Sequence, residues 1–533
     1  MAGERGNVKR ISLWVVIVLL LSACKAPWVG LAPWARSAPH PAVRPSDVDW
    51  DDRTIFGAGL IAAQRAMLDR LPGATVYHMD LQLSDDLLLL QGHEQVRYTN
   101  QEDEPLQEIY FRLFPNVTGG ETAVSAVQVD GQRVEPAYEA FRSAMRVPLA
   151  TALQPGEQVV VEMDLAVSVP QEMGGNYGLF GCFEGVLVLD TFYPVIPVYD
   201  DEGWNVEVPS PNGDLTYQDA SFYLVRLIAP ARLTVVASGI AVGRERACPE
   251  LSERVPRERA CPELSEREGD AQVWTFAAGP ARDFYLAASD RYTVVSAKVG
   301  ETTVNSYALK EQEGGAELAL RHAVDALESL NARLGTYPYT EFDVASTPMR
   351  ALGIEYPGLV GISLRLYDPG EEVSGMPSQV VLESTVAHEV AHQWFYNVVG
   401  NDQADEPWLD EAIVQYVVGL YYVDVHGERA AQAYRASWQS RWDRVERAEI
   451  PIGMPTGRYA GQEYGAIVYG RGPFFVTALA EEMGQETFDA FLRDYVASHQ
   501  WGIGTGEAFK ELAERHCQCD LSSLFEEWVY ERL

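Results

Sequence analysis

The strongest local constraint on this chain is a pair of histidines four residues apart, His388 and His392, which enclose Glu389 in an HExxH pattern. Residues i and i+4 lie on the same face of an α-helix, so both imidazoles can reach one metal ion. Ser378 is expected to cap the start of this helix, and Gly400 to follow its end. We therefore predict a helix that offers two metal ligands from one face.

A third candidate ligand, Glu411, follows His392 after eighteen intervening residues. Pro407 suits the first turn of a second helix, and Gly427 can end that helix. Two histidines and one carboxylate leave the fourth position of a zinc ion open, as in catalytic sites, whereas structural zinc sites are closed by four protein ligands. The alternative is that Glu411 is a solvated acid in a first helical turn. The pattern predicts one catalytic Zn²⁺ per chain, held by His388, His392 and Glu411.

Glu389 is the candidate general base of this site. It is adjacent to the first histidine but projects in a different direction along the helix. Zinc lowers the pKa of a water molecule bound to it. A carboxylate at this position can take the proton of that water and pass it to a leaving amine.

The size and charge of the chain limit what it can be. Its 533 residues are too many for one ordinary core, so at least two packed domains are expected. The formal net charge of −36 argues against nucleic acid as a partner, because phosphate binding requires a basic surface. Such an acidic surface can steer cationic peptides, or it can serve solubility or high-salt adaptation.

Residues 1–24 have the composition of an export signal. A positively charged start precedes an apolar stretch, Ile11 to Leu21, that is too short to span a bilayer comfortably. The stretch ends in Leu-Ser-Ala-Cys, which resembles a bacterial lipobox and predicts lipidation of Cys24. A plain signal peptide and an uncleaved anchor are the alternatives, and all three export the folded part. We expect a protein anchored to the outer face of a bacterial membrane, with the Pro-rich residues 25–56 as a tether.

Residues 57–292 are predicted to form an all-β domain, sandwich-like in its strand pattern. Turn residues separate short alternating segments, and no run has the period of a long helix. Examples of these segments are 77–83, 93–98 and 158–165. The run RERACPELSER occurs twice, which predicts an exposed duplicated loop at 244–267, with pairing of Cys248 and Cys261 as one option.

Residues 293–533 are predicted to be mainly helical. The amphipathic stretch 316–334, the two ligand-bearing segments and the C-terminal segments 472–482 and 521–530 carry this pattern. Cys517 and Cys519 are accompanied by one histidine and no second pair of ligands. A disulfide or a plain structural role is therefore expected for them rather than a metal site.

The two ligand segments resemble the aminopeptidase N family of gluzincin zinc metallopeptidases, which also includes leukotriene hydrolase. The residues that carry the resemblance are HEVAHQWF at 388–395 and WLDEA at 408–412. Asp410 and Ala412 stand where Asn and Gly are usual, and neither change removes a ligand. The resemblance implies a multidomain α+β fold, in which an N-terminal saddle-like β-domain precedes a thermolysin-like catalytic domain at 293–533.

The same resemblance suggests roles for three further residues. Residues 352–356 resemble the exopeptidase motif Gly-x-Met-Glu-Asn in their glutamate alone, so Glu355 would bind the free α-amine of a substrate; the alternative is a structural acid. Tyr469 resembles the tyrosine that stabilises the tetrahedral intermediate, with an ordinary packed tyrosine as the alternative. Glu184 is the candidate for a second amine-binding group, which the family draws from its β-domain.

The chain ends 64 residues after Tyr469, so it resembles a short form of the family without the C-terminal helical domain, and its cleft is expected to be open. The leading expectation is a zinc-dependent aminopeptidase acting on peptides with a free N-terminus outside the cell. A gluzincin endopeptidase is the first alternative. The second is a non-catalytic binding lipoprotein on the same fold.

Overall fold

The computed structural model describes residues 41–214, 216–247 and 270–530. The export signal with Cys24, the start of the tether, and Cys248 with Cys261 in the duplicated loop lie outside these ranges. The later part of the expected tether differs from an extended spacer. It forms the 3-10 turns η1 (Pro45–Asp47) and η2 (Thr54–Gly59), and Trp50 stacks on His78 with 4.1 Å between ring centroids. These residues are therefore part of the fold.

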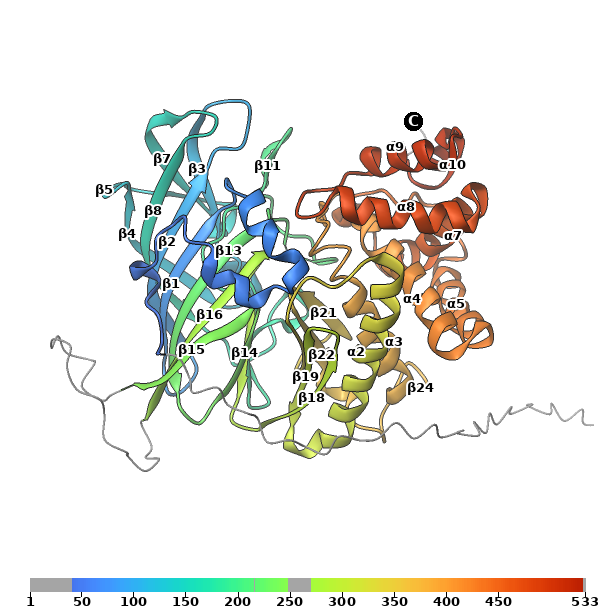
Figure 1. Cartoon of the computed structure of the whole chain (residues 1–533), viewed down its shortest axis with the longest axis horizontal. Coiled ribbons are helices and arrows are strands. Elements are labelled where there is room, and N and C mark those ends of the chain that lie inside the picture. Colours follow the sequence, from blue (N-terminus) through green and yellow to red (C-terminus); the bar gives the residue numbers. More distant parts are fainter. Residues whose placement is uncertain (1–40, 215, 248–269, 531–533) are drawn as a thin grey trace, which may run out of the picture. The chain divides into compact units, whose positions relative to one another are not determined.

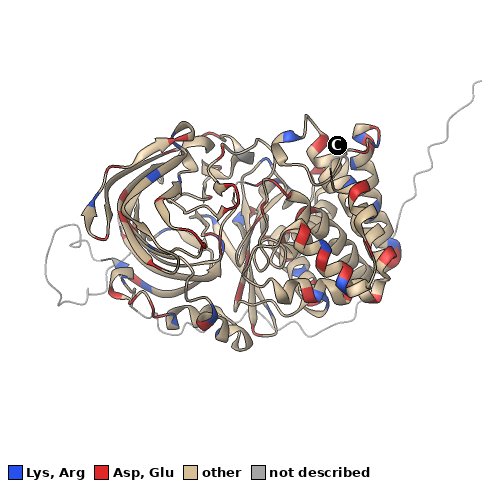
Figure 2. Ribbon diagram, turned by 90° about the horizontal axis from the view of Figure 1, so that it is seen from above, with Lys and Arg blue, Asp and Glu red and all other residues tan. Residues whose placement is uncertain are grey.

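A curved eight-stranded sheet dominates the N-terminal β-domain (Figures 1 and 2). Along β8, buried and exposed residues alternate with period two, which places Val159, Val161 and Met163 on the inner face. In sheet order the strands are β15 (Ile240–Ala247), β16 (Ala271–Ala281), β13 (Ser221–Pro230), β1 (Val76–Leu83), β2 (Leu89–Thr99), β8 (Gln158–Ser168), β4 (Glu121–Val129) and β5 (Gln132–Arg133).

Smaller sheets complete this domain and enclose an apolar core with the large sheet. Within the core, Tyr77 and Tyr223 stack with 4.8 Å between their ring centroids. The four-stranded sheet runs β14 (Thr234–Ala237), β17 (Leu286–Ser289), β10 (Val186–Leu189) and β9 (Phe180–Phe183). The others are β3 (Leu106–Arg112), β7 (Ala144–Leu153) and β6 (Ala137–Glu139), and the pair β11 (Tyr199–Asp200) and β12 (Gly203–Trp204).

A separate five-stranded mixed sheet opens the catalytic domain. Its order is β18 (Tyr292–Val299), β19 (Thr302–Leu309), β20 (Glu341–Thr347), β22 (Leu359–Ser363) and β21 (Gly353–Tyr356). The sequence pattern did not reveal this sheet, because its later strands are short and buried throughout rather than alternating. Helices α2 (Glu313–Leu334) and α3 (Ser378–Ala391) pack beside it (Figure 1), and α2 confirms the predicted helical stretch 316–334.

The remainder of the catalytic domain is helical. Its helices are α4 (Glu411–His426), α5 (Glu428–Trp442), α6 (Glu463–Ala466), α7 (Gly472–Met483), α8 (Gln485–Ser498), α9 (Gly506–Cys517) and α10 (Ser522–Trp528). Cys517 and Cys519 form a disulfide, which is one of the two roles expected for them. Among the described residues, no helix is both long and apolar enough to cross a membrane.

The two domains share a buried apolar cluster. Tyr285, just before β17, stacks on Tyr356 of β21 with 3.9 Å between ring centroids. Val186 and Leu359 are buried in the same cluster. The strand that carries Glu355 therefore packs directly against the β-domain.

Candidate metal centre

Helix α3 presents His388 and ends with His392 at its C-terminal cap. The Nε2 atoms of the two imidazoles are 3.2 Å apart, and the ring planes are perpendicular. The start of the helix differs from the sequence expectation. Ser378 is its first residue rather than its cap, and the Ser378 hydroxyl donates a hydrogen bond to the carbonyl of Asp368. The predicted pairing of the two histidines on one face is confirmed.

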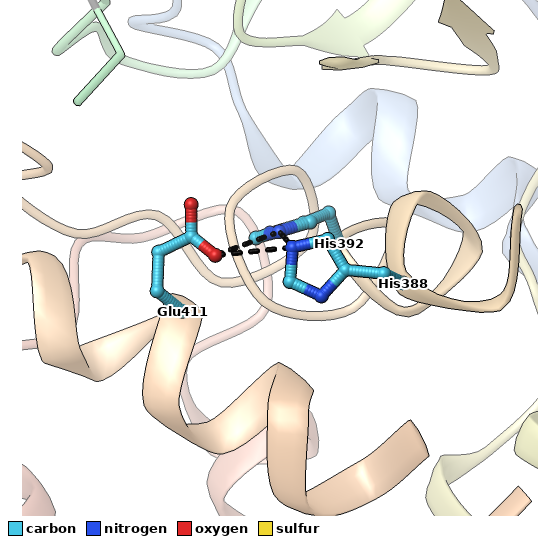
Figure 3. A group of neighbouring side chains, drawn as sticks. All are labelled: His388, His392 and Glu411. Atoms are coloured by element: carbon cyan, nitrogen blue, oxygen red, sulfur yellow. Dashed lines mark hydrogen bonds and ion pairs between the residues drawn. The ribbon is translucent and has the colours of Figure 1, made fainter. Parts of the chain in front are cut away.

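Glu411 is the first residue of α4, and Asp410 caps that helix by accepting a hydrogen bond from the Glu411 N–H at 2.7 Å. Glu411 Oε2 lies 3.1 Å from His388 Nε2 and 3.6 Å from His392 Nε2 (Figure 3). This oxygen is buried and makes no hydrogen bond of good geometry within the described ranges. An orphaned carboxylate oxygen facing two imidazoles fits a cation shared by all three groups. These residues can therefore hold a metal ion.

Neighbouring groups orient the three ligands. His392 Nδ1 lies 3.1 Å from the carbonyl of Phe395, and the side-chain amide of Gln415 lies 3.2 Å from His388 Nδ1. Contacts of this kind fix which ring nitrogen faces a metal. Burial raises the pKa of Glu411, but the contacts with His388 and His392 outweigh burial and hold that pKa below its usual range. The carboxylate is thus ionised, as a ligand must be.

Glu389 lies beside the ligands and packs against β21. It is 4% exposed, and a Cβ added to Gly353 would lie 2.2 Å from Glu389 Oε1. Burial raises the pKa of Glu389, and the charges of Glu411 and Asp214 raise it further. A carboxylate with a raised pKa is suited to accepting a proton and returning it.

The structure also brings Glu355 and Tyr469 to this centre. Glu355 Oε1 lies 3.7 Å from His392 Nδ1, and the side chain is buried. Tyr469 lies in the π-helical turn η12 (Ile467–Arg471), and its hydroxyl donates a hydrogen bond to Glu411 Oε1. Single π-turns inside helices are frequent at functional sites. Both residues are therefore within reach of a substrate held at the metal.

Glu184 is not brought to the centre. It is exposed at the tip of the hairpin between β9 and β10, where its carbonyl accepts a hydrogen bond from Arg291 at 2.8 Å. The role suggested for Glu184 rested on its linear distance from other residues, and the hairpin directs it to solvent instead.

Two residues that the sequence did not single out do reach the centre. Burial and the charges of Glu411 and Asp410 raise the pKa of Asp214 to about 8. Gln403 hydrogen-bonds to Glu355 and Asp410. Neither residue has a fixed spacing from the ligands or a helical period, so no local pattern marks it.

Comparisons with known proteins agree with this geometry. The peptidase family M1 domain matches residues 318–528. Aminopeptidase N of Lactococcus lactis subsp. lactis is 26% identical over 280 residues, which are 48% of this chain and 32% of that protein. Human aminopeptidase O is 22% identical over 247 residues, which are 40% of this chain and 29% of that protein. The matched part therefore spans about a third of these curated relatives.

Solved structures match the fold over most of its length. The M1 zinc metallopeptidase of Deinococcus radiodurans aligns with a TM-score of 0.56 and 21% identity, covering 86% of this chain and 93% of that one. A mutant of it bound to a Tyr-Ser-Ala substrate aligns with a TM-score of 0.58 and 20% identity, covering 86% and 94%. These likenesses confirm the expected fold class, a β-rich domain followed by a catalytic domain. Residues 318–528 match the peptidase family M1 domain, and the chain is similar to aminopeptidase N and to M1 zinc metallopeptidases, which agrees with the expected resemblance to the aminopeptidase N family of gluzincin metallopeptidases.

Proposed function

We propose that this protein is a zinc-dependent aminopeptidase that hydrolyses N-terminal residues from peptides. The observation that carries the proposal is the position of Glu355, whose Oε1 lies 3.7 Å from His392 Nδ1 beside the metal centre. A buried carboxylate there can bind the α-ammonium group of a peptide whose scissile carbonyl is at the metal. Such an arrangement favours peptides that begin at that point. The aminopeptidases among the relatives support the same reading.

Each residue of the centre has a proposed task. His388, His392 and Glu411 would hold the zinc ion, which when bound supplies an activated water and polarises the scissile carbonyl. The Glu389 carboxylate accepts the proton of the attacking water and delivers it to the leaving amine. The Tyr469 hydroxyl would donate to the developing oxyanion, and its hydrogen bond to Glu411 Oε1 supports this role because it keeps the hydroxyl beside the ligands.

The test compares a substrate with a free amine to the same substrate with a blocked amine. Leucine p-nitroanilide and its N-acetyl form are offered to the purified protein, with and without a chelator. We expect cleavage of the free-amine substrate alone, lost on chelation and restored by Zn²⁺. Glu355→Gln should lower kcat/KM about 30-fold or more, because a buried charge pair loses one partner. Glu372→Gln, which changes an exposed acid in β23 (Glu372–Val373), is the matched control.

Other outcomes would favour the alternatives. Cleavage of the blocked substrate, or of internal bonds in a longer peptide, would indicate an endopeptidase. A zinc-loaded protein that cleaves neither substrate would instead indicate a binding protein on this fold.

We further propose export and a lipid anchor at Cys24, on the outer face of a bacterial membrane. The support is the charged start, the apolar stretch and the Leu-Ser-Ala-Cys ending of residues 1–24. Labelled palmitate should be incorporated into the wild-type protein and not into Cys24→Ser. Label retained by the variant would contradict the anchor.

A further inference from the structure

We propose that Gln403 is a positioning residue that holds Glu355 and Asp410 in fixed relation, and so couples the amine-binding carboxylate to the metal-binding helix. The role of Glu355 in this inference rests on the proposed aminopeptidase function. Gln403 lies between the end of α3 and the start of α4, and it is 3% exposed. Among the described residues, its side chain makes no hydrogen bond to a metal ligand, so we infer that it acts through its neighbours Glu355 and Asp410.

One side-chain amide serves both carboxylates. Gln403 Nε2 lies 3.2 Å from Glu355 Oε1 and 2.9 Å from Asp410 Oδ2. The nitrogen carries two hydrogens, so each carboxylate can receive one. Among the described residues, Gln403 is the only side chain that hydrogen-bonds to Glu355. It fixes one oxygen of that carboxylate and leaves the other for an ammonium group.

The opposite end of the amide is fixed by the β-domain. The Thr216 hydroxyl donates a hydrogen bond to Gln403 Oε1 at 3.3 Å, from the segment that leads into β13. Turning the amide over would set Oε1 against two carboxylates and would lose both hydrogen bonds. The orientation of Gln403 is therefore determined by its partners, and it connects the β-domain to the centre.

Asp410 connects Gln403 to the helix that carries the metal ligand Glu411. Its Oδ1 accepts from the Glu411 N–H at 2.7 Å, while its Oδ2 accepts from Gln403. Asp410 is 1% exposed and has no donor of its own, so both oxygens need donors from neighbours. With both present, the cap of α4 is rigid, and Glu411 is presented to the two histidines. Removing the amide would loosen the cap and Glu355 together.

The test uses Gln403→Met, which keeps the chain length and removes the hydrogen bonds. Binding of leucine hydroxamate and N-acetyl-leucine hydroxamate to zinc-loaded protein is measured by calorimetry, because the two ligands differ only at the amine. The rate at which a chelator removes zinc is the second measurement. Gln218→Met is the matched control, since Gln218 is also buried but its amide makes no hydrogen bond within the described ranges.

We expect Gln403→Met to weaken leucine hydroxamate about tenfold more than the acetylated ligand, and to release zinc about tenfold faster, as loss of an outer-shell partner does. Gln218→Met should change neither quantity. Thr216→Val should also weaken leucine hydroxamate more than the acetylated ligand and speed zinc release, in both cases by smaller factors than Gln403→Met. If Gln403→Met fails to fold, Thr216→Val is the variant that tests the inference. Equal weakening of both ligands with unchanged zinc release would overturn the inference.

A failure of the proposed function would look different. Wild-type protein would then bind the free and the acetylated hydroxamate equally, before any variant is considered. The inference about Gln403 would in that case be decided by zinc release alone. Faster release from Gln403→Met than from Gln218→Met would support the role at Asp410, and equal release would overturn it.

Discussion

The Glu389 carboxylate has room in the site because its neighbour Gly353 has no side chain. A methyl group on Gly353 would lie 2.2 Å from Glu389 Oε1 and 2.7 Å from its Cδ. The backbone φ of Gly353 is not in the left-handed region, so glycine is needed there for room rather than for its conformation. In the motif resemblance this position is the unspecified one, and the structure gives it a physical requirement.

Gly353→Ala should therefore displace the general base without removing a metal ligand. We expect kcat to fall about 100-fold, which is the lower range for loss of general acid–base catalysis, while bound zinc stays at one per chain. Steady-state kinetics and atomic absorption measure the two quantities. Gly314→Ala is the matched control, because an added Cβ at Gly314 in α2 meets nothing within 4 Å. Wild-type kcat in Gly353→Ala would show that Glu389 is not held by this contact.

At the scale of elements, the segment before β1 closes over the outer face of the large sheet. Trp50 stacks on His78 of β1, and Asp51 accepts from Arg97 Nη1 of β2 at 2.6 Å. His78 is 4% exposed, and burial together with the charges of Arg97 and Arg53 lowers its pKa to about 4. His78 is therefore neutral in the folded protein at neutral pH.

This segment should make stability depend on pH through His78. In the unfolded chain its pKa is about 6.5, so between about pH 6.5 and 4 the unfolded state holds a proton that the folded state lacks. The stabilisation is complete above pH 6.5 and is lost as pH falls towards 4, by about 3 kcal/mol. His78→Phe keeps a ring for Trp50 and cannot be protonated, so its thermal midpoint should fall less than that of wild type between pH 7 and 4. Equal falls in the thermal midpoints of the two proteins would contradict the assignment of this pH dependence to His78.

An element could be predicted where residues close together in the sequence form a pattern that indicates it. The ligand-bearing part of α3 and the presence of a second helix at Glu411 were predictable, because ligands on helices recur at fixed spacings. The start of that helix was wrong, because Pro407 lies in a separate 3-10 turn, η9 (Pro407–Leu409), and α4 begins at Glu411. Ser378 was wrong as a cap because its hydroxyl finds a partner outside the helix, at Asp368. The later strands of the five-stranded sheet, β20 and β22, were missed because short, buried strands have no alternation that separates them from helix.

The candidate site divides in the same way. His388, His392 and Glu411 follow one spacing along two successive helices, so the sequence contained their relation. Gln403 and Asp214 reach the centre only through tertiary packing, and the order of residues along the chain does not reveal that packing. Glu184 failed as a candidate for the same reason, since the turn of a hairpin decides where it points.

At the scale of the whole molecule, Arg282 connects three separate segments beside the domain junction. Arg282 is 2% exposed, and its guanidinium donates to three backbone carbonyls: Asn397 at 3.0 Å, Gln218 at 3.0 Å and Gly502 at 2.6 Å. Asn397 follows the metal-binding helix, and Gln218 lies in the same segment as Thr216, before β13. A Cβ on Gly400 would lie 2.3 Å from Arg282 Cζ, so the guanidinium packs directly on this backbone. Arg282, a side chain of the β-domain, therefore binds both the segment that follows α3 and the loop that follows α8.

Arg282→Met should destabilise the protein and disturb the centre together. The Gly502 carbonyl keeps the Gly400 N–H as a donor, whereas the carbonyls of Asn397 and Gln218 lose theirs. Each buried carbonyl left without a donor costs about 1–3 kcal/mol, so we expect the free energy of unfolding to fall by about 2 kcal/mol or more. At 25 °C kcat/KM should also fall, because the segments that place His392 and Thr216 lose their common anchor. The matched control is Arg226→Met in β13, where Arg226 pairs with the half-exposed Asp80 at 2.6 Å and the loss should be about 1 kcal/mol at most. Calorimetry measures the free energy of unfolding, and steady-state kinetics measure kcat/KM, for both variants. Similar losses of stability and activity in the two variants would mean that Arg282 does not link the domains to the site.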